Sequence, residues 1–314
     1  MDNELIFLKP VFKQVLWGGD LLRKEYGYDI PGDDTGECWA ISAHENGNCQ
    51  VSGGSYDGKT LSWLWENHRE LFGDYPGDRF PLLIKIIDAK EDLSIQVHPD
   101  DYYANKHENG ALGKTECWYV LNCKEGASIV IGHNAKTKEE LEEMIDQKRW
   151  KELIREVPVH KGDFFQIEPG CIHAIKGGTL IFETQQSSDI TYRVYDYDRL
   201  SDGRPRQLHV EQSKAVITVP YEGEKVKPIH QIIDGGVKTH LVDCRYYSVD
   251  KYEVKDELKL NFNGYFTNVS IIEGCGSING RELPKGTHFI IPYNYGLCSF
   301  KGSFTMICSS PVAL

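Results

Sequence analysis

The sequence predicts an all-β protein, a sandwich or barrel of short strands with minor helical insertions. Most of the chain consists of short apolar or alternating runs separated by Gly, Asp and Asn turns, which is typical of that class. Only two segments have a helical pattern, residues 61–72 and 137–156. An internal echo between residues 161–169 and 285–292 predicts that the chain contains two related β-domains.

The clearest predicted strands are apolar runs bounded by turn residues. In chain order they cover residues 80–87, 127–131, 178–184 and 268–272. The segment 137–156 begins with Thr137-Lys-Glu-Glu140, a capping box in which side chains satisfy free N–H groups of the first helical turn. Leu141 and Ile145 follow at helical spacing, which predicts a helix packed on the core, and Pro158 ends the segment.

The internal echo sets the expected domain division. Lys161-Gly162-Asp-Phe-Phe-Gln-Ile-Glu-Pro resembles Lys285-Gly286-Thr-His-Phe-Ile-Ile-Pro, and a further Lys-Gly pair follows each copy. We therefore expect a metal-binding domain of residues 1–232, with its helical insertion near 137–156. A smaller β-domain without metal should follow in residues 233–314.

Composition excludes several classes of function. The chain of 314 residues is 40% hydrophobic and 26% charged, as in soluble globular proteins. No stretch approaches the roughly 18 apolar residues needed to cross a bilayer, so no membrane association is expected. The net charge of −12, with no basic tract, argues against a nucleic-acid partner. Nine cysteines without a Cys-x-x-Cys pair favour free thiols in a reducing cytoplasm.

Four residues form a candidate metal site on the predicted strands. Gln96 and His98 are two positions apart, so on a strand both side chains point to the same face. Glu116 lies in the next alternating stretch, and His173 follows a strand and a Pro-Gly turn. Two imidazoles, a carboxylate and an amide oxygen suit Zn²⁺ or a similar ion, with room for water or substrate. The alternative is that they are unrelated core or surface residues, as a lone strand histidine usually is.

The motifs around these residues resemble the cupin superfamily and, within it, the type I mannose-6-phosphate isomerases. Residues 162–173 have the spacing of the second cupin motif, with Pro169 one position early and Gly170 and His173 in register. The first cupin motif usually offers His-x-His, and here Gln96 replaces the first histidine. Further matches are Gly-Glu-Cys-Trp-Ala-Ile-Ser from residue 36, Gly-Lys-Thr-Glu-Cys-Trp-Tyr from residue 113, and Asp-Ile-Thr-Tyr-Arg from residue 189. The resemblance covers most of the chain. The chain is similar in length to the enzymes of the short bacterial branch of the family.

This resemblance implies two cupin jelly-roll domains with one zinc ion in the amino-terminal domain. The family's zinc ligands correspond to Gln96, His98, Glu116 and His173. The implied reaction interconverts D-mannose 6-phosphate and D-fructose 6-phosphate through a cis-enediol or enediolate. The family's essential arginine corresponds to Arg193, and its two pocket lysines correspond to Lys85 and Lys114.

The roles of the remaining candidates stay open at this point. Glu183 lies on an apolar strand ten residues after His173 and is the candidate carboxylate for acid–base work, although Lys114 or metal-bound water could also move the proton. Trp17 is a candidate wall of the sugar pocket. Lys85 could instead point outward from an edge strand, and Arg193 could form a surface salt bridge.

Two other functions fit the same motifs. One is an iron cupin dioxygenase, although its first motif would normally carry His-x-His. The other is a non-catalytic cupin that binds a sugar phosphate. A small sugar phosphate is the expected partner, and the chain could be a monomer or a homodimer.

Overall fold

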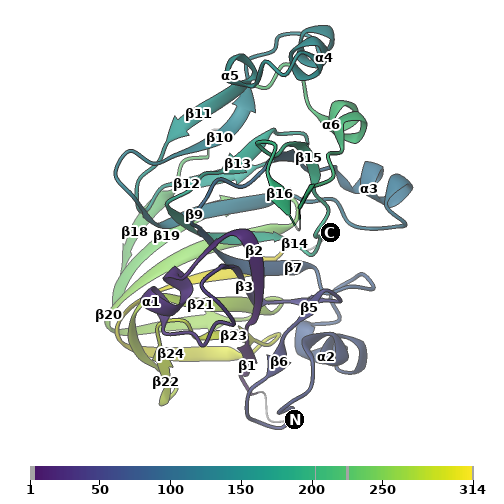
Figure 1. Cartoon of the computed structure of the whole chain (residues 1–314). Helices are drawn as coiled ribbons and strands as arrows, with labels where there is room; N and C mark the ends of the chain where they lie inside the picture. Colours follow the sequence, from purple (N-terminus) through teal and green to yellow (C-terminus); the bar gives the residue numbers. More distant parts are fainter. Residues whose placement is uncertain (1–3, 202, 224–225, 313–314) are drawn as a thin grey trace.

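The computed structural model describes residues 4–201, 203–223 and 226–312. Within these residues the strands form three main sheets (Figure 1). The five-stranded sheet has the order β11 (Ile154–Pro158), β10 (Ser128–His133), β13 (His173–Ile175), β8 (Ile95–Val97) and β15 (Tyr192–Tyr195). The six-stranded sheet has the order β12 (Phe164–Ile167), β9 (Glu116–Cys123), β14 (Thr179–Gln186), β7 (Leu82–Ala89), β2 (Val11–Gly19) and β3 (Thr35–Ile41), and β7 also pairs with β3. The predicted all-β class with minor helical insertions is confirmed.

The third sheet has nine strands in the described part of the chain. Its order is β18 (Ile229–Ile233), β19 (Gly236–Asp243), β20 (Tyr247–Phe262), β24 (Gly296–Pro311), β21 (Thr267–Ile278), β23 (His288–Ile291), β1 (Ile6–Lys9) and β6 (Gln50–Val51), with β22 (Arg281–Pro284) beside β21. Strand β1 lies against β23, so the first strand of the chain belongs to the sheet of the carboxyl-terminal segment. This sheet thus joins segments from both sides of the predicted domain boundary between residues 232 and 233, and that boundary stays a prediction.

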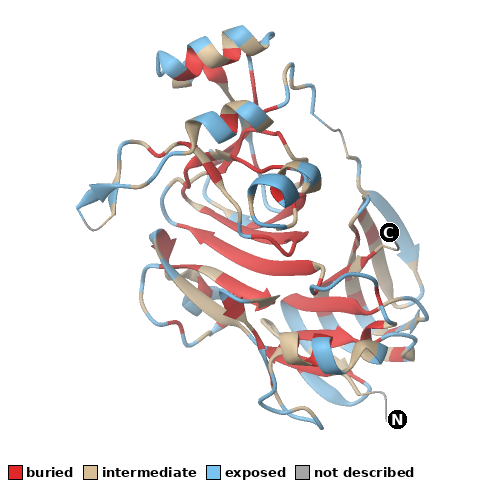
Figure 2. Cartoon of the chain, turned by 90° about the vertical axis from the view of Figure 1, so that its right-hand side faces the viewer, coloured by how far each residue is buried: buried red, intermediate tan, exposed pale blue. Residues whose placement is uncertain are grey.

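The six-stranded sheet is the middle layer of the molecule. Its strands β7 and β14 are buried at every residue, as strands covered on both faces are; β7 is a nearly continuous apolar run, whereas β14 also buries polar side chains. Ile87 and Trp118 pack in one cluster with Ile129 and Ile175 of the five-stranded sheet. On the other face, Ile84 and Phe182 share a core with residues of the nine-stranded sheet. Figure 2 shows this central band of buried strands, with exposed residues on the helices, the turns and some outer strands.

The segments of the internal echo occupy comparable positions. The first copy forms β12 next to β9, and the second forms β23 next to β21. A glycine with positive φ precedes each strand, Gly162 at 95° and Gly286 at 86°, a conformation that residues with a Cβ rarely adopt. The two copies therefore share a turn as well as a sequence pattern.

The helices are shorter than the sequence suggested. The segment 61–72 splits into α2 (Leu61–Asn67) and a 3₁₀ helix (Arg69–Phe72). The segment 137–156 contains α4 (Lys138–Asp146) and α5 (Trp150–Leu153), and the chain enters strand β11 at Ile154, so the predicted helical end near residue 156 is wrong. The remaining short helices were not predicted, because six or seven residues are too few for a helical repeat; they are α1 (Leu21–Tyr26), α3 (Asp101–His107) and α6 (Val210–Val216).

Other local features follow from identifiable contacts. Thr137 caps α4 by accepting a hydrogen bond from the Glu140 backbone N–H, as predicted. The return bond of the capping box goes to the N–H of Lys136 instead of Thr137. Lys148 has a φ of 56°, which interrupts the helical path between α4 and α5. Small ribbons form from β4 (Ala43–His44) with β5 (Gly47–Asn48), and from β16 (Leu200–Ser201) with β17 (Arg204–Pro205). None of the described helices has the length and apolar character that a bilayer span requires.

Candidate active site

Strand pairing brings three of the predicted site residues into one row. On the five-stranded sheet, His173 of β13 lies opposite Gln96 of β8, and Gln96 lies opposite Arg193 of β15. Directly opposed residues of antiparallel strands carry their side chains on the same face. The metal-ligand candidates and the candidate catalytic arginine are therefore neighbours across three strands, although they are far apart in sequence.

A second row crosses the six-stranded sheet. Trp118 of β9 lies opposite Glu183 of β14, Glu183 opposite Lys85 of β7, and Lys85 opposite Trp39 of β3. Glu116 is two residues before Trp118 and shares its face. Because the two sheets pack on each other, the two rows meet in one interior space.

Three groups that could hold a metal ion converge there. The Nε2 atoms of His98 and His173 are 3.1 Å apart. The Glu116 carboxylate oxygens lie 3.5 Å from His98 Nε2 and 3.4 Å from His173 Nε2. All three side chains are about 1% exposed. The amide of Gln96 lies beside them: its Nε2 is 3.3 Å from His173 Nε2, and its Oε1 accepts a hydrogen bond from Ser94 Oγ at 3.3 Å.

The chemistry of this cluster fits a metal ion. Glu116 Oε2 is paired with the Lys114 ammonium group at 3.1 Å, but Oε1 has no hydrogen-bond partner within the described residues, which is costly for a buried charged group. His173 Nδ1 lies 2.9 Å from the Cys171 carbonyl oxygen; by donating there, it leaves Nε2 with a free lone pair. Burial lowers the pKa of His173 to about 4, which keeps the imidazole neutral. A tetrahedral ion with bonds of about 2.0–2.1 Å holds its ligand atoms roughly 3.3 Å apart, close to the separations found.

A cavity of about 230 Å³ opens beside this cluster. It contains Gln96 and all five of the residues predicted to act on or contact the substrate: Trp17, Lys85, Lys114, Glu183 and Arg193. Trp17 is 5% exposed and forms part of the wall. Several further residues of the wall were not assigned a role from the sequence, and they include Glu37, Ser94, Asp189 and Arg206.

Lys85 is held between two carboxylates inside the molecule. Its Nζ lies 3.6 Å from Glu183 Oε1 and 3.8 Å from Glu37 Oε2. Lys85 is 5% exposed on an interior strand, so the alternative of an outward edge-strand lysine is wrong. Glu37 shares strand parity with Trp39, a signal in the quoted Gly-Glu-Cys-Trp motif that could have identified it.

Each of these carboxylates is also held by a tryptophan. The indole N–H of Trp118 donates to Glu183 Oε2 at 2.9 Å, and that of Trp39 donates to Glu37 Oε2 at 2.6 Å. Burial raises the pKa of Glu183, and the nearby Glu116 carboxylate raises it further. Glu183 is therefore a fixed carboxyl group with an increased proton affinity.

The two remaining cations differ in their contacts. Lys114 Nζ lies 3.1 Å from Glu116 Oε2. Burial lowers the pKa of Lys114, but Glu116 and Glu183 raise it by more, so that it lies above its usual value. Arg193 donates through Nη1 to the Gln207 carbonyl at 3.2 Å, while its buried Nε has no hydrogen-bond partner in the described chain. Arg193 forms no ion pair with a described carboxylate, so the surface salt-bridge alternative is wrong for this part of the chain.

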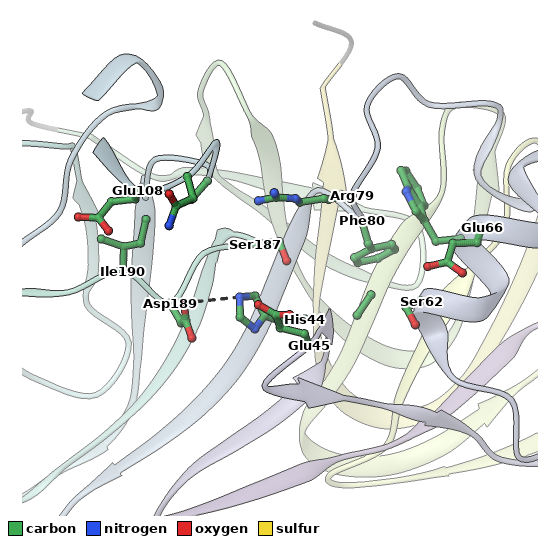
Figure 3. Close-up of a pocket in the computed structure, with 14 residues that line it drawn as sticks. His44, Glu45, Ser62, Glu66, Arg79, Phe80, Glu108, Ser187, Asp189 and Ile190 are labelled. Atoms are coloured by element: carbon green, nitrogen blue, oxygen red, sulfur yellow. Dashed lines mark ion pairs between the residues drawn. The ribbon is translucent and has the colours of Figure 1, made fainter. Parts of the chain in front are cut away.

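A larger cavity of about 460 Å³ adjoins this site (Figure 3). Asp189 lines both cavities, and its Oδ1 lies 3.5 Å from His44 Nε2. None of the predicted site residues lines the larger cavity. The chemistry therefore gathers in the smaller of the two spaces.

Comparisons with known proteins agree with this geometry. A family model described as the catalytic domain of type I phosphomannose isomerase matches residues 5–119, and one described as the cupin domain of mannose-6-phosphate isomerase matches residues 237–311. The chain is 49% identical to mannose-6-phosphate isomerase ManA of Bacillus subtilis, over 98% of this chain and 99% of that protein. It is 47% identical to mannose-6-phosphate isomerase of Streptococcus mutans, over 98% of each chain.

The fold comparison gives the same result. The crystal structure of a mannose 6-phosphate isomerase from Bacillus subtilis superposes with a TM-score of 0.95 at 48% identity, covering 97% of this chain and 99% of that one. This likeness and the cupin-domain match confirm the predicted cupin jelly-roll fold. The chain therefore belongs to the type I mannose-6-phosphate isomerase family of enzymes.

Proposed function

We propose that this chain is a zinc-dependent isomerase that interconverts D-mannose 6-phosphate and D-fructose 6-phosphate through a cis-enediol or enediolate. The observation that carries the proposal is the convergence of His98, Glu116 and His173 beside a cavity lined by paired acids and bases. That cavity offers the three elements the reaction needs: a metal, a proton carrier, and cations that stabilise negative charge.

One zinc ion per chain is the proposed cofactor. Gln96, His98, Glu116 and His173 are its proposed ligands, and their nitrogen and oxygen donors suit zinc. When bound, the ion supplies Lewis acidity that polarises the oxygens of the sugar. The buried Glu116 carboxylate supports this assignment, because its Oε1 has no hydrogen-bond partner in the described chain.

Glu183 is the proposed proton carrier. The isomerisation moves one proton between C2 and C1, so the carrier must take it from one carbon and return it to the other. A carboxylate whose pKa is raised by burial takes a proton more readily than an exposed one. Its fixed position, with Trp118 on one oxygen and Lys85 on the other, keeps it directed at one place in the cavity. Lys114 remains the alternative carrier.

The cations stabilise the charge that develops on the sugar. Arg193 has a buried, unpartnered Nε donor and is always protonated, so it can bind the developing enediolate. Lys85 and Lys114 are proposed to hold hydroxyl groups of the substrate and to balance the charge of the surrounding carboxylates. Trp17 is proposed to close one side of the cavity against the apolar face of the sugar.

The two competing functions are less well supported. An iron dioxygenase is not favoured, because the relatives that match over nearly the whole chain are named as isomerases. A non-catalytic binding cupin would not need two buried lysines and a carboxyl group of raised proton affinity around the ligand. The free state of all nine cysteines supports the proposed cytoplasmic location. Residues 1–232 and 233–314 remain the proposed domains.

A coupled assay on mannose 6-phosphate tests the proposal. We expect isomerisation that is lost on chelation and restored by zinc but not by iron. Absence of turnover with substrate bound would support the binding cupin, and restoration by iron alone would refute zinc as the cofactor.

A further inference from the structure

The arginines beside the site cavity carry more positive charge than the one carboxylate among them neutralises. Three arginines, Arg193, Arg199 and Arg206, gather around the single buried carboxylate of Asp196, which is 3% exposed. Two of them, Arg193 and Arg206, line the cavity, and Arg199 does not. This arginine cluster stands out in a chain whose net charge is −12.

Arg206 is held in a fixed orientation by this carboxylate. Its Nε donates to Asp196 Oδ2 at 2.7 Å, and its Nη2 donates to Oδ1 at 2.5 Å. Such a bidentate contact fixes the plane of the guanidinium group. Its Nη1 has no hydrogen-bond partner in the part of the chain that the structure describes. The Arg206 guanidinium group therefore has a fixed orientation, and its Nη1 keeps N–H donors available to a ligand.

Arg199 uses its donors differently. Its Nη2 shares Asp196 Oδ1 at 2.5 Å, and its Nη1 donates to the Asp92 carbonyl oxygen at 2.5 Å. Its guanidinium group thus serves the loop structure outside the cavity. Arg199 and Arg206 form a matched pair, with the same charge and the same carboxylate but different access to the cavity.

The two lysines of the cavity wall are each paired with a carboxylate, so they add no unbalanced positive charge. Lys85 lies between Glu37 and Glu183, and Lys114 contacts Glu116. The cavity wall there holds these two lysines and two carboxylates, those of Glu37 and Glu183. The carboxylate of Asp189, which also lines the cavity, accepts a hydrogen bond from Asn46 and lies near His44.

The neighbouring larger cavity is a poor place for a dianion. Arg79 is its one arginine among the described lining residues, and it shares the space with four carboxylates, those of Glu45, Glu66, Glu108 and Asp189 (Figure 3). The two cavities therefore differ in the sign of their charge, and the arginine cluster is the better match for phosphate.

We propose that Arg206, positioned by Asp196, binds the phosphate group of the substrate, with Arg193 beside it. This inference rests on the proposed function, in which the substrate is a sugar phosphate. Arg199 and Asp196 are paired outside the cavity wall, so the two guanidinium groups on the wall, Arg193 and Arg206, face a phosphate monoester that carries about −1.5 to −2 near neutral pH. Planar guanidinium groups also match phosphate oxygens in two-point contacts.

The electrostatics of Arg193 support this arrangement. Burial lowers the pKa of Arg193, and the positive charges of Arg206 and Arg199 act in the same direction against the opposing effect of Asp196. A bound phosphate would relieve this repulsion.

The test compares Arg206→Gln with the matched control Arg199→Gln in the full-length, zinc-loaded protein. Steady-state kinetics with mannose 6-phosphate give kcat and KM, and a ³¹P NMR titration with inorganic phosphate gives an affinity that needs no turnover. A lost charge-assisted contact is worth about one to two powers of ten in affinity. We expect Arg206→Gln to raise KM and weaken phosphate binding ~10- to ~100-fold, while Arg199→Gln stays within about threefold of the unaltered chain.

Several outcomes would overturn the inference. Unchanged phosphate affinity in Arg206→Gln, or an equal loss in Arg199→Gln, would show that Arg206 is not the phosphate ligand. If Arg206→Gln does not fold, Arg206→Lys is measured instead, because it keeps the charge but loses the bidentate contact with Asp196. Unaltered KM and phosphate affinity in that variant would refute the proposed role of this contact in positioning Arg206. Should the unaltered chain bind phosphate but not isomerise mannose 6-phosphate, the proposed function fails while the phosphate site stands.

Discussion

Replacing Glu183 with glutamine removes the proposed proton carrier and changes little else. Glutamine has nearly the same shape, and its amide oxygen can still accept the hydrogen bond from Trp118 Nε1. The replacement abolishes one carboxylate next to Lys85, but Glu37 remains 3.8 Å from the Lys85 ammonium group. The variant therefore separates proton transfer from the shape of the cavity.

The expected magnitudes for stability and catalysis differ. At 3.6 Å and an effective dielectric constant of about 20, the attraction between Glu183 and Lys85 is about 4–5 kcal/mol. The replacement also removes the burial cost of the Glu183 charge and its repulsion by Glu116, which act in the opposite direction. The free energy of unfolding should therefore change by less than this attraction alone. Loss of a general acid–base group lowers kcat about 10²- to 10⁴-fold, equivalent to roughly 3–5 kcal/mol in the barrier.

The assay measures kcat with mannose 6-phosphate, together with zinc content and the melting temperature. Glu37→Gln is the matched control, because Glu37 also contacts Lys85 and also accepts from a tryptophan. We expect it to reduce kcat by no more than about tenfold. A Glu183→Gln variant that keeps kcat within about threefold would refute the assignment. Equal losses in both variants would mean that the acids balance the charge of Lys85 and that neither moves the proton.

Three further predictions concern the arginine, the metal and a buried histidine. Arg193→Ala should lower kcat at least about 10²-fold with zinc content intact, and a zinc-free variant would make the residue structural instead. Chelation should lower the melting temperature, because an ion bound only to the folded state at a hundred times its Kd stabilises it by about 2.7 kcal/mol; an unchanged melting temperature would argue against metal held by His98, Glu116 and His173. Burial lowers the pKa of His288 to about 3 from an ordinary 6.5, so its contribution to stability is complete above pH 6.5 and is lost as pH falls toward 3. At pH 5 the loss is about 2 kcal/mol, and denaturant titrations of His288→Gln should show a pH dependence weaker by that amount; an identical dependence would contradict the reasoning.

The candidate ligands could be recognised from the sequence because their signals are local. Gln96 and His98 share a strand face by parity, as do Lys114 and Glu116, and the Pro-Gly turn places His173 at the start of a strand. The capping box at Thr137 likewise involves neighbouring residues only, and the helix begins where it predicts. Residues that depend on short-range periodicity were therefore the ones most readily found.

The length of the helices and the partners of the charged groups required the tertiary structure. The chain leaves the predicted helix at Ile154 because residues 154–158 pair with β10, a contact between distant segments. Strand parity could have marked Glu37 but not its partner, Lys85 on a neighbouring strand. Arg206 gave no signal in the sequence, since its importance lies in its contacts with Asp196 and the site cavity.

By itself, the sequence determined the all-β class, the metal-ligand set to be tested and the family resemblance. Only the tertiary structure decided that His173, Gln96 and Arg193 form one row, and that Arg193 and Arg206 line the same cavity. The physical reason is that strand periodicity is a property of adjacent residues. Charge balance depends on distances of 3–4 Å between side chains that only the pairing of the strands and the packing of the sheets bring together.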